Sequence, residues 1–346
     1  MPDRVLWLGT QLTTAPRSGG AIRSLRLLEA LARHAEVDLV TTEPSGGDLP
    51  VASHHRGAAP GQAGRALAVA RGWPRATARS CAPSTIAAAR RLAPTAARVV
   101  VEWVHLFPLV PPGPYVLATH NVEADRSEDP RLVRAERRLV ADPRATVLCV
   151  SERDRDLLGP GAQVVPNGTD VPPATTPVPD DGPLLFVGAM DYAPNRLAVE
   201  WWAREVWRPA LPPLTVAGRA ADTLPPLDGV ESAGEVESVA PLLDRAALVV
   251  VPLHHGGGTR LKVLEAMAAN RPVLSTAKGV EGLDVTGACV VADEAPAFAA
   301  AVRDLLADPA RRRALAAAGR AVAERHDWRP IGERFAELVL SAPRRG

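Results

Sequence analysis

The amino-acid sequence predicts an α/β protein built from two doubly wound domains, each with a parallel sheet. Short apolar runs, typical of buried parallel strands, alternate with helical segments, and the series begins afresh near residue 184. The 346 residues exceed one ordinary core and suit two domains of about 150 to 180 residues each. A proline-rich stretch at 169–182 shows no helical period, which predicts a linker between the domains.

The N-terminal part opens with a predicted strand at 5–8 and a loop that ends in Gly19 and Gly20. A helix is expected over 21–34, because apolar side chains recur there every three residues. A second strand is expected at 37–40. This order of strand, glycine loop, helix and strand is typical of the start of a doubly wound sheet.

Three more strands are predicted in this domain, and the middle one ends in a histidine. Apolar runs at 98–103, 115–121 and 145–151 indicate them. Ligands bind beyond the carboxyl ends of parallel strands, so His120 is a candidate site residue. A strand-end histidine alone is more often structural, and both interpretations stay open at this point.

The domain limits follow from these elements. The N-terminal domain is predicted to span 1–168 and the second domain 183–327, with a last helix at 328–346. The second domain begins with a strand at 184–188, which ends in Gly188.

Three consecutive glycines mark the strongest candidate site of the second domain. A buried strand at 247–252 precedes Gly256, Gly257 and Gly258, and Thr259 is placed to cap the helix that follows. The N–H groups at a helix N-terminus and the positive end of the helix dipole attract anions. Glycines let an anion approach the backbone closely. The sequence therefore predicts a phosphate site here.

Two cations follow the glycines, at a helix end where positive charge is unfavourable. Arg260 and Lys262 are expected in the first helical turn, where a negatively charged ligand would offset the repulsion. The chain has 40 basic residues, and only Lys262 and Lys278 are lysine, so a lysine at this position is unusual. The alternative is a capped surface helix with two solvated cations.

The run GGGTRLKVLEAM at 256–267, followed by PVLST at 272–276 and GVEGL at 279–283, resembles the donor-binding signature of the family 4 retaining glycosyltransferases. Such enzymes have the GT-B fold, which consists of two facing Rossmann-like domains with an interdomain cleft and a C-terminal helix crossing back to the first domain. Their motif commonly holds two glutamates. In this sequence the second is Glu265, and Gly257 occupies the first position, which is similar to a glycine-rich branch of the family.

The resemblance implies a nucleotide-diphosphate sugar as donor and transfer of its sugar to an acceptor hydroxyl. It implies that Glu265 contacts the ribose, that Val236 lies where the nucleobase binds, and that His120 contacts the sugar. Most members hold the diphosphate with an Arg and a Lys in the loop after the domain's first strand. Those positions are neutral or displaced here, so Arg260 and Lys262 would supply the charge. The implied catalytic residues are His120, Arg260 and Lys262, and the implied donor-binding residues are Gly19, Gly20, Gly188, Asn195, Gly257, Gly258, Thr259, Glu265 and Val236.

Composition limits the partners. A net charge of +1 gives no global field that would recruit nucleic acid. Cys81, Cys149 and Cys289 are far apart and odd in number, which favours a reducing cytoplasm. No group of His, Cys, Asp or Glu has metal-ligand spacing, so we expect no metal and no cofactor beside the donor substrate. No apolar run reaches the ~18 residues of a membrane span, so a soluble, cytoplasmic protein is expected.

The stretch 49–101 contains eight arginines and neither aspartate nor glutamate. It predicts a basic surface on the N-terminal domain. Such a surface suits an anionic or lipid-linked acceptor, or peripheral contact with the inner face of an anionic membrane. The alternative is a solvated insert without a specific partner.

Two other functions stay open. A nucleotide-sugar epimerase of the same fold needs acidic residues poised over the sugar, and the sequence shows no such cluster. A non-catalytic partner subunit would bind nucleotide without turnover. Gly257 in place of the first glutamate favours the subunit, whereas His120, Lys262 and Glu265 argue against it.

Overall fold

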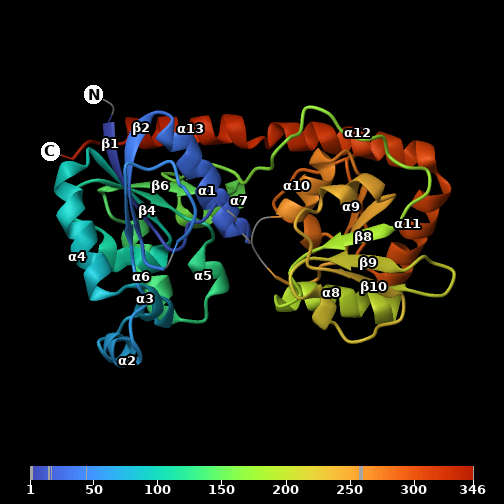
Figure 1. Ribbon diagram of the computed structural model, residues 1–346, viewed down its shortest axis with the longest axis horizontal. Helices are drawn as coiled ribbons and strands as arrows, with labels where there is room; N and C mark the ends of the chain where they lie inside the picture. Colours follow the sequence, from blue (N-terminus) through green and yellow to red (C-terminus); the bar gives the residue numbers. More distant parts are fainter. Residues whose placement is uncertain (1–2, 15, 17, 44, 257–259, 346) are drawn as a thin grey trace. The chain divides into compact units, whose positions relative to one another are not determined.

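The computed structural model describes every residue except 1, 2, 15, 17, 44, 257–259 and 346. Figure 1 shows two compact units, each with its own sheet. The first unit consists of Met1–Asn167 and Arg329–Gly346, and the second of Gly168–Trp328. No helix in the described part of the chain combines the length and apolar character needed to cross a bilayer.

The first unit contains a seven-stranded sheet in the order β3-β2-β1-β4-β5-β6-β7. Neighbouring strands pair in parallel, and the chain order reverses between β1 and β4, a switch point of the kind at which open α/β sheets bind ligands. The strands are β1 (Asp3–Gly9), β2 (Ala35–Thr41), β3 (Ser53–Arg56), β4 (Arg98–Glu102), β5 (Tyr115–Ala118), β6 (Ala145–Cys149) and β7 (Gln163–Val164).

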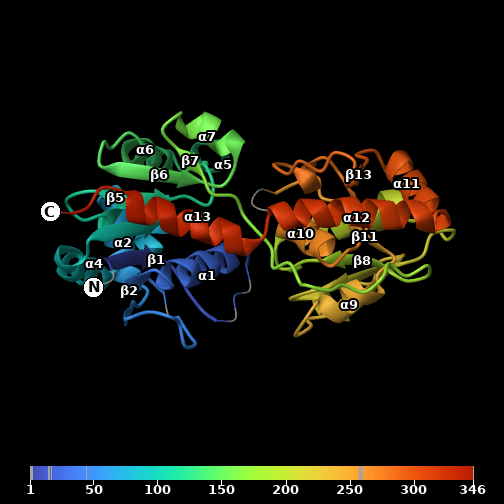
Figure 2. The same cartoon turned by 90° about the horizontal axis from the view of Figure 1, so that it is seen from above.

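The helices of the first unit cover both faces of the sheet, and successive side chains of β1 point to opposite faces. Trp7 packs against Phe335 of α13, with ring centroids 5.6 Å apart, and a Cβ on Gly332 would lie 2.6 Å from Ala30 of α1. The neighbouring Leu6 belongs to a core on the other face, formed with α4 and α6. Figure 2 shows α1 and α13 lying over the same face of the sheet. The helices are α1 (Gly19–Ala32), α2 (Gln62–Ala70), α3 (Arg75–Ser80), α4 (Pro83–Leu92), α5 (Glu123–Arg126), α6 (Pro130–Val140), α7 (Glu152–Leu158) and α13 (Trp328–Ser341), with 3₁₀ turns at Ala93–Thr95 and Val104–Leu109.

The second unit contains a six-stranded parallel sheet in the order β10-β9-β8-β11-β12-β13. Its core includes Phe186, Trp202, Met267 and Phe298, all fully buried. The strands are β8 (Leu184–Val187), β9 (Leu214–Ala217), β10 (Val230–Gly234), β11 (Leu248–Val251), β12 (Val273–Ser275) and β13 (Val290–Val291). The helices are α8 (Ala193–Trp201), α9 (Ala240–Arg245), α10 (Leu261–Ala268), α11 (Ala295–Ala307) and α12 (Pro309–Arg325), with a π-helical turn at Trp202–Val206 and 3₁₀ turns at Ala221–Thr223 and Lys278–Val280.

Three arginines hold the proline-rich residues 172–180, here called the strap, onto the second unit. Arg271 donates to the carbonyl oxygens of Thr176 at 2.6 Å and Pro177 at 3.0 Å. Arg312 donates to the carbonyl of Asp180 at 2.6 Å. Arg320 donates to the carbonyl of Pro172 at 2.5 Å. A guanidinium offers five donors in a fixed fork, so one side chain can satisfy several carbonyls of a segment that lacks regular structure.

The two passages of the chain into and out of the second unit run beside each other. The N–H of Thr169 donates to the carbonyl of His326 at 2.8 Å, and the N–H of Trp328 donates to the carbonyl of Thr169 at 3.2 Å. A Cβ on Gly168 would lie 2.7 Å from the His326 oxygen, so the close approach requires a glycine. The second unit therefore begins and ends at one place.

The predicted fold class is confirmed by the two parallel sheets and their flanking helices. Several boundaries differ from the prediction. The first helix begins at Gly19 rather than residue 21, because the Ser18 hydroxyl accepts from the N–H of Ala21 and caps it. The strand expected to reach residue 103 ends at Glu102, since Trp103 turns the chain with a φ of 80°.

Candidate functional site

Lys262 lies in the first turn of α10 and points at the start of α8. Its Nζ donates to Oδ1 of Asn195 at 2.7 Å and lies 4.3 Å from the centre of the Phe186 ring. Asn195, in the first turn of α8, is itself held by a bond from Nδ2 to the carbonyl of Ala189 at 2.9 Å. Strand β8 and helices α8 and α10 thus bring together two of the predicted site residues.

Glycines at the ends of β8 and β9 leave the room that this arrangement needs. A Cβ on Gly188 would lie 2.7 Å from Nδ2 of Asn195 and 3.0 Å from Nζ of Lys262. Gly218 has a φ of 135°, and a Cβ there would lie 2.4 Å from the Gly188 oxygen. Gly256 has a φ of 95°, and a Cβ there would lie 2.9 Å from Pro194. The backbone therefore approaches the lysine and the start of α8 more closely than other residue types permit.

The ionisable groups of α10 have shifted pKa values. The pKa of Lys262 is lowered to about 7, chiefly by burial and then by the charge of Arg260, against the opposing effect of Glu265. The pKa of Glu265 is raised, chiefly by burial; Lys262 lowers it and Asp170 raises it. Part of each side chain remains exposed, yet the charged ends have lost much of their water. The alternative of two solvated cations at this helix end is wrong.

Arg260 occupies the position before α10 rather than its first turn. Only 5% of its surface is exposed, and its Nη2 donates to Oε2 of Glu281 at 3.0 Å. Lys278 donates to the same oxygen at 2.8 Å. The two cations near the glycine run therefore share one carboxylate, whereas Lys262 forms no ion pair with any residue that the structure describes.

Some predicted donor-binding residues are placed differently or not at all. Gly257, Gly258 and the predicted cap Thr259 lie outside the described residues. Val236 lies two residues beyond β10 and is partly exposed. Its expected place near a nucleobase stays a prediction.

His120 lies just beyond β5 in the first unit and is 7% exposed. Its ring stacks on Trp103, with centroids 3.8 Å and planes 7° apart. A Cβ on Gly20 would lie 3.1 Å from the Trp103 ring and 3.5 Å from Nδ1 of His120. The first turn of α1, which contains Gly19 and Gly20, therefore closes directly on the histidine.

Glu102, at the end of β4, was not predicted as a site residue. It is 1% exposed, and its Oε1 lies 2.8 Å from Nε2 of His120. The Ser24 hydroxyl donates to the same oxygen, and Trp7 Nε1 donates to Oε2 at 3.3 Å. The signal in the sequence was an acidic residue that ends an otherwise apolar strand next to the strand leading to His120.

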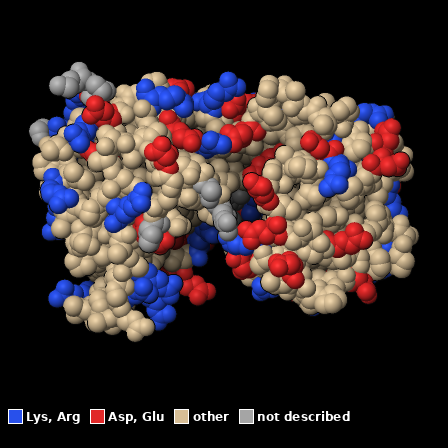
Figure 3. Space-filling model, in the orientation of Figure 1, with Lys and Arg blue, Asp and Glu red and all other residues tan. Residues whose placement is uncertain are grey.

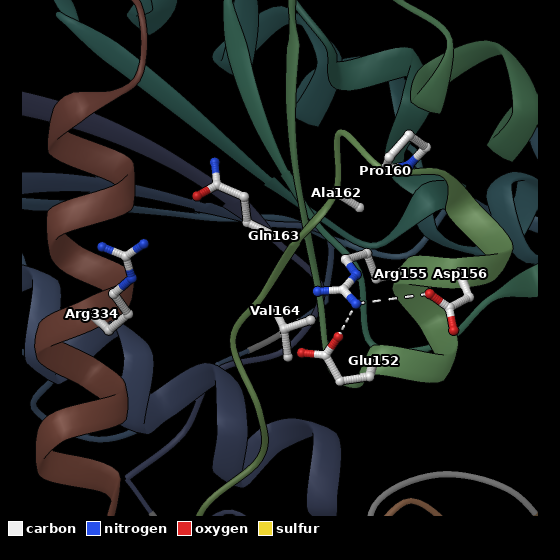
Figure 4. A pocket seen from close by; sticks show the side chains of 8 residues that line it. All are labelled: Glu152, Arg155, Asp156, Pro160, Ala162, Gln163, Val164 and Arg334. Atoms are coloured by element: carbon white, nitrogen blue, oxygen red, sulfur yellow. Dashed lines mark ion pairs between the residues drawn. The ribbon is translucent and has the colours of Figure 1, made fainter.

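Among the described residues, pockets also occur away from the predicted site residues. Figure 4 shows one in the first unit, about 730 Å³ in volume, where Arg155 pairs with Glu152 and Asp156. Another, about 580 Å³ in volume, lies in the second unit beside Trp201 and His254, whose rings are 4.4 Å apart. Among the described residues, no group of three His, Cys, Asp or Glu side chains is arranged to hold a metal ion.

The second unit is similar to a known protein family, and the whole chain is similar to solved structures. Residues 182–308 match the family described as glycosyl transferases group 1. The chain is similar to sucrose-phosphate synthase from Thermosynechococcus elongatus, with a TM-score of 0.71, 18% identity, and coverage of 97% of this chain and 98% of that one. A comparison with curated protein sequences gave no significant match.

Two further structures show the same likeness. HepE of Anabaena, in complex with UDP, has a TM-score of 0.71 and 14% identity, covering 98% of this chain and 100% of that one. WaaG, a glycosyltransferase involved in lipopolysaccharide biosynthesis, has a TM-score of 0.70 and 16% identity, covering 97% and 100%. Residues 182–308 thus match a glycosyl transferase group 1 domain, and the chain as a whole has the GT-B fold.

Proposed function

We propose that the protein is a retaining, metal-independent glycosyltransferase of the family 4 type, in its glycine-rich branch. It transfers a sugar from a nucleotide-diphosphate sugar to an acceptor hydroxyl and needs no cofactor. The observation that carries the proposal is the desolvated Lys262, held by the neutral Asn195 at the N-terminus of α10 within the group 1 domain. A buried cation without a carboxylate partner is suited to a bound anion.

Each residue of the second unit has a defined part in this proposal. Lys262, Arg260 and the N–H groups at the start of α10 stabilise the charge of the diphosphate as it leaves. Glu265, one turn further along the helix, accepts hydrogen bonds from the ribose hydroxyls. The structures of HepE with UDP and with UDP-glucose make UDP-glucose a reasonable first donor to test.

In the first unit, His120 contacts the transferred sugar, and the start of α1 at Gly19 and Gly20 faces the donor phosphates. Support comes from the switch point of the sheet between the paired strands β1 and β4, where the strand order reverses. Open α/β sheets bind ligands at such points. His120 and Gly20 lie against each other there.

The acceptor is proposed to be anionic or lipid-linked and to be presented at the inner face of a membrane, with the protein cytoplasmic. Helix α2 has no buried residue, and Leu67 on it is 51% exposed. Arg71, Arg75 and Arg79, which follow it, are all exposed. Figure 3 shows basic side chains on both sides of α2. The prediction that Arg98 is part of the basic surface is wrong. Arg98 is buried and pairs with Asp3.

A donor screen tests the proposed activity. A nucleotide sugar that binds the folded protein raises its melting temperature with ligand concentration. We expect at least one nucleotide sugar to do so and to be slowly hydrolysed by the wild-type protein. Binding without hydrolysis or transfer would favour a non-catalytic partner subunit, and isomerisation of the donor sugar would favour an epimerase. No binding of any nucleotide sugar would contradict the proposal.

The acceptor part has a separate test. Attraction between exposed charges weakens as the Debye length shrinks from about 30 Å at 0.01 M salt to about 8 Å at 0.15 M. Transfer to an acceptor in anionic vesicles should therefore fall with salt, while donor hydrolysis changes less. Changing Arg71, Arg75 and Arg79 to glutamate should reproduce the salt effect, because transfer at low salt then falls as it does when salt is added. A matched triple change of Arg303, Arg311 and Arg325, which are exposed in the second unit, should not. Equal salt dependence of transfer and hydrolysis would leave a neutral small molecule as the acceptor.

A further inference from the structure

From the geometry around β4 and β5 we infer that Glu102 is a positioning residue for His120. It fixes the imidazole in the tautomer that carries its proton on Nε2, so that Nδ1 is offered as a hydrogen-bond acceptor to a hydroxyl of the substrate sugar. This inference rests on the proposed function, because it assigns a second residue to the sugar contact of His120.

The surroundings of Glu102 define it as an acceptor. Three donors converge on its two oxygens: the Ser24 hydroxyl and His120 Nε2 on Oε1, and Trp7 Nε1 on Oε2. The indole N–H of Trp7 can only donate, and a carboxylate only accepts. The Ser24 hydroxyl, which also lies 2.9 Å from the carbonyl oxygen of Gly20, has one proton for these two acceptors. With both oxygens engaged and 1% of the residue exposed, the carboxylate has one fixed orientation.

The tautomer of His120 follows from this contact. A neutral imidazole has one N–H and one lone pair, and the hydrogen bond that one nitrogen makes decides which is which. Because Nε2 faces an acceptor at 2.8 Å, it must carry the proton. The lone pair is then on Nδ1, which forms no hydrogen bond with any residue that the structure describes.

The ring cannot easily turn to exchange its two nitrogens. Its face is stacked on Trp103 at 3.8 Å, and the backbone of Gly20 approaches it closely from the start of α1. Trp103 has a φ of 80°, a conformation that is uncommon for a bulky residue and is maintained only where the surroundings enforce it. This unusual backbone places the indole under the imidazole.

Burial keeps the ring neutral. Burial lowers the pKa of His120, Glu102 raises it and Arg23 lowers it, with a net lowering. The neighbouring His105, whose pKa is lowered to about 4 chiefly by burial, adds no positive charge near neutral pH. A neutral ring that accepts at Nδ1 suits a hydroxyl, which can donate to it.

The other partner at this spot is the first turn of α1. The N–H groups at a helix N-terminus have no intrahelical acceptor. A Cβ on Gly20 would lie 3.5 Å from Nδ1, so this first turn closes on the lone pair and brings helix-end donors close to one acceptor. A sugar offers hydroxyls that donate and accept at once, so a sugar hydroxyl is complementary to this acceptor. The diphosphate of a nucleotide sugar is fully ionised near neutral pH and has no proton to give to Nδ1, so it can face only the N–H groups.

The tautomer can be observed directly by nitrogen NMR of protein labelled at histidine, with the His120 signal assigned by its loss in His120→Gln. We expect the wild-type ring to carry its proton on Nε2. Glu102→Gln should move the proton to Nδ1, because Trp7 holds the amide oxygen in the place of Oε2 and leaves the amide N–H₂ in the place of Oε1, facing Nε2. The Ser24 hydroxyl can accept from this N–H₂ while it donates to the carbonyl of Gly20. Ser24→Ala removes one donor from the carboxylate and should keep the proton on Nε2. A proton on Nδ1 in the wild-type protein would overturn the inference without any variant.

Kinetics supply the second readout. Glu102→Gln should lower kcat/KM for hydrolysis of the donor identified in the screen by about tenfold, the effect of one lost hydrogen bond. Its melting temperature should change no more than that of Ser24→Ala. If Glu102→Gln is active and His120→Ala is inactive, the positioning role of Glu102 is rejected and the proposed function is not. An active His120→Ala variant, or a wild-type protein that binds no nucleotide sugar, would instead reject the proposed function, and the NMR result would stand apart from both.

Discussion

Lys262 donates a hydrogen bond to the amide oxygen of Asn195, 2.7 Å away, and not to a carboxylate. A buried lysine beside a neutral partner retains its charge only at a cost, since desolvation disfavours the charged form. Arg260 beside it differs, because it already pairs with Glu281. Lys262 is therefore the cation of this region with most to gain from a bound anion.

Removing this charge should affect turnover more than folding. We expect Lys262→Ala to lower donor turnover by about two orders of magnitude, equivalent to roughly 3 kcal/mol of lost electrostatic stabilisation. Lys262→Arg should also be impaired, because a planar fork cannot replace a point charge between Asn195 and Phe186. Lys278→Ala, which changes the other lysine of the chain, is the control and should remain active. Full activity of Lys262→Arg would show that Lys262 is only a general cation.

The same lysine should make stability depend on pH. Its pKa is about 7 in the folded protein and 10.5 ordinarily, so between these values the unfolded chain holds a proton that the folded chain has released. The free energy of unfolding then rises with pH in this window, and the penalty of the buried cation is greatest below pH 7. Lys262→Met should therefore stabilise the protein most below pH 7 and less as the pH approaches 10.5. Urea unfolding of both proteins across this range measures the difference, and a constant difference would contradict the lowered pKa.

Glu265 is expected to act on the donor and not on the fold. Glu265→Gln keeps the size of the side chain but removes the acceptor charge, so donor affinity should fall by about tenfold to a hundredfold. The melting temperature should hardly change, because the pKa of Glu265 is raised by burial and no ion pair that the structure describes depends on it. Binding is measured by calorimetry and stability by thermal unfolding. A variant that unfolds would identify Glu265 as a structural carboxylate.

Gly188 tests whether the close approach of the backbone matters. In Gly188→Ala the new methyl group would meet Asn195 at 2.7 Å and Lys262 at 3.0 Å, so one of them must move. We expect a loss of about 1 to 3 kcal/mol in unfolding free energy together with weaker donor binding. Gly161→Ala is the matched control, because a Cβ there meets nothing within 4 Å and no left-handed backbone is involved. Normal donor binding by Gly188→Ala would separate the glycine from the site.

The contribution of the buried arginines that bind the strap can be tested by comparing two adjacent arginines. Arg312 is fully buried and donates to the carbonyls of Leu305, Leu306 and Asp180, whereas Arg311 is exposed. Arg312→Lys should lower the unfolding free energy by about 2 kcal/mol, since a single ammonium cannot satisfy all these buried oxygens. Arg311→Lys should change it by less than about 0.5 kcal/mol. Equal effects in denaturant titrations would mean that the bonds to the strap contribute little.

These residues also show how far the sequence alone could lead. Apolar runs and glycines suffice to predict both sheets, because strand burial and tight turns are local properties. The rarity of lysine singled out Lys262 correctly as a residue that is not merely solvated. Neither residue type nor charge distinguishes Arg312 from Arg311, and packing against the strap and the end of α11 decides which one is buried. The sequence did not identify Glu102 as a site residue for a similar reason. Its contact with His120 comes from two strands that are neighbours in the sheet and not in the sequence.

The chain enters the second unit at Thr169 and leaves it at Trp328, and the two segments are hydrogen-bonded to each other. The second unit is therefore arranged like a domain inserted into the first. The first unit is discontinuous, and the second is a continuous stretch whose ends meet. Insertions of this kind are tolerated where the ends of the inserted part are close together. The second unit could therefore be exchanged for that of a relative by two joins that lie beside each other, near Thr169 and Trp328, without changing the path of the first unit.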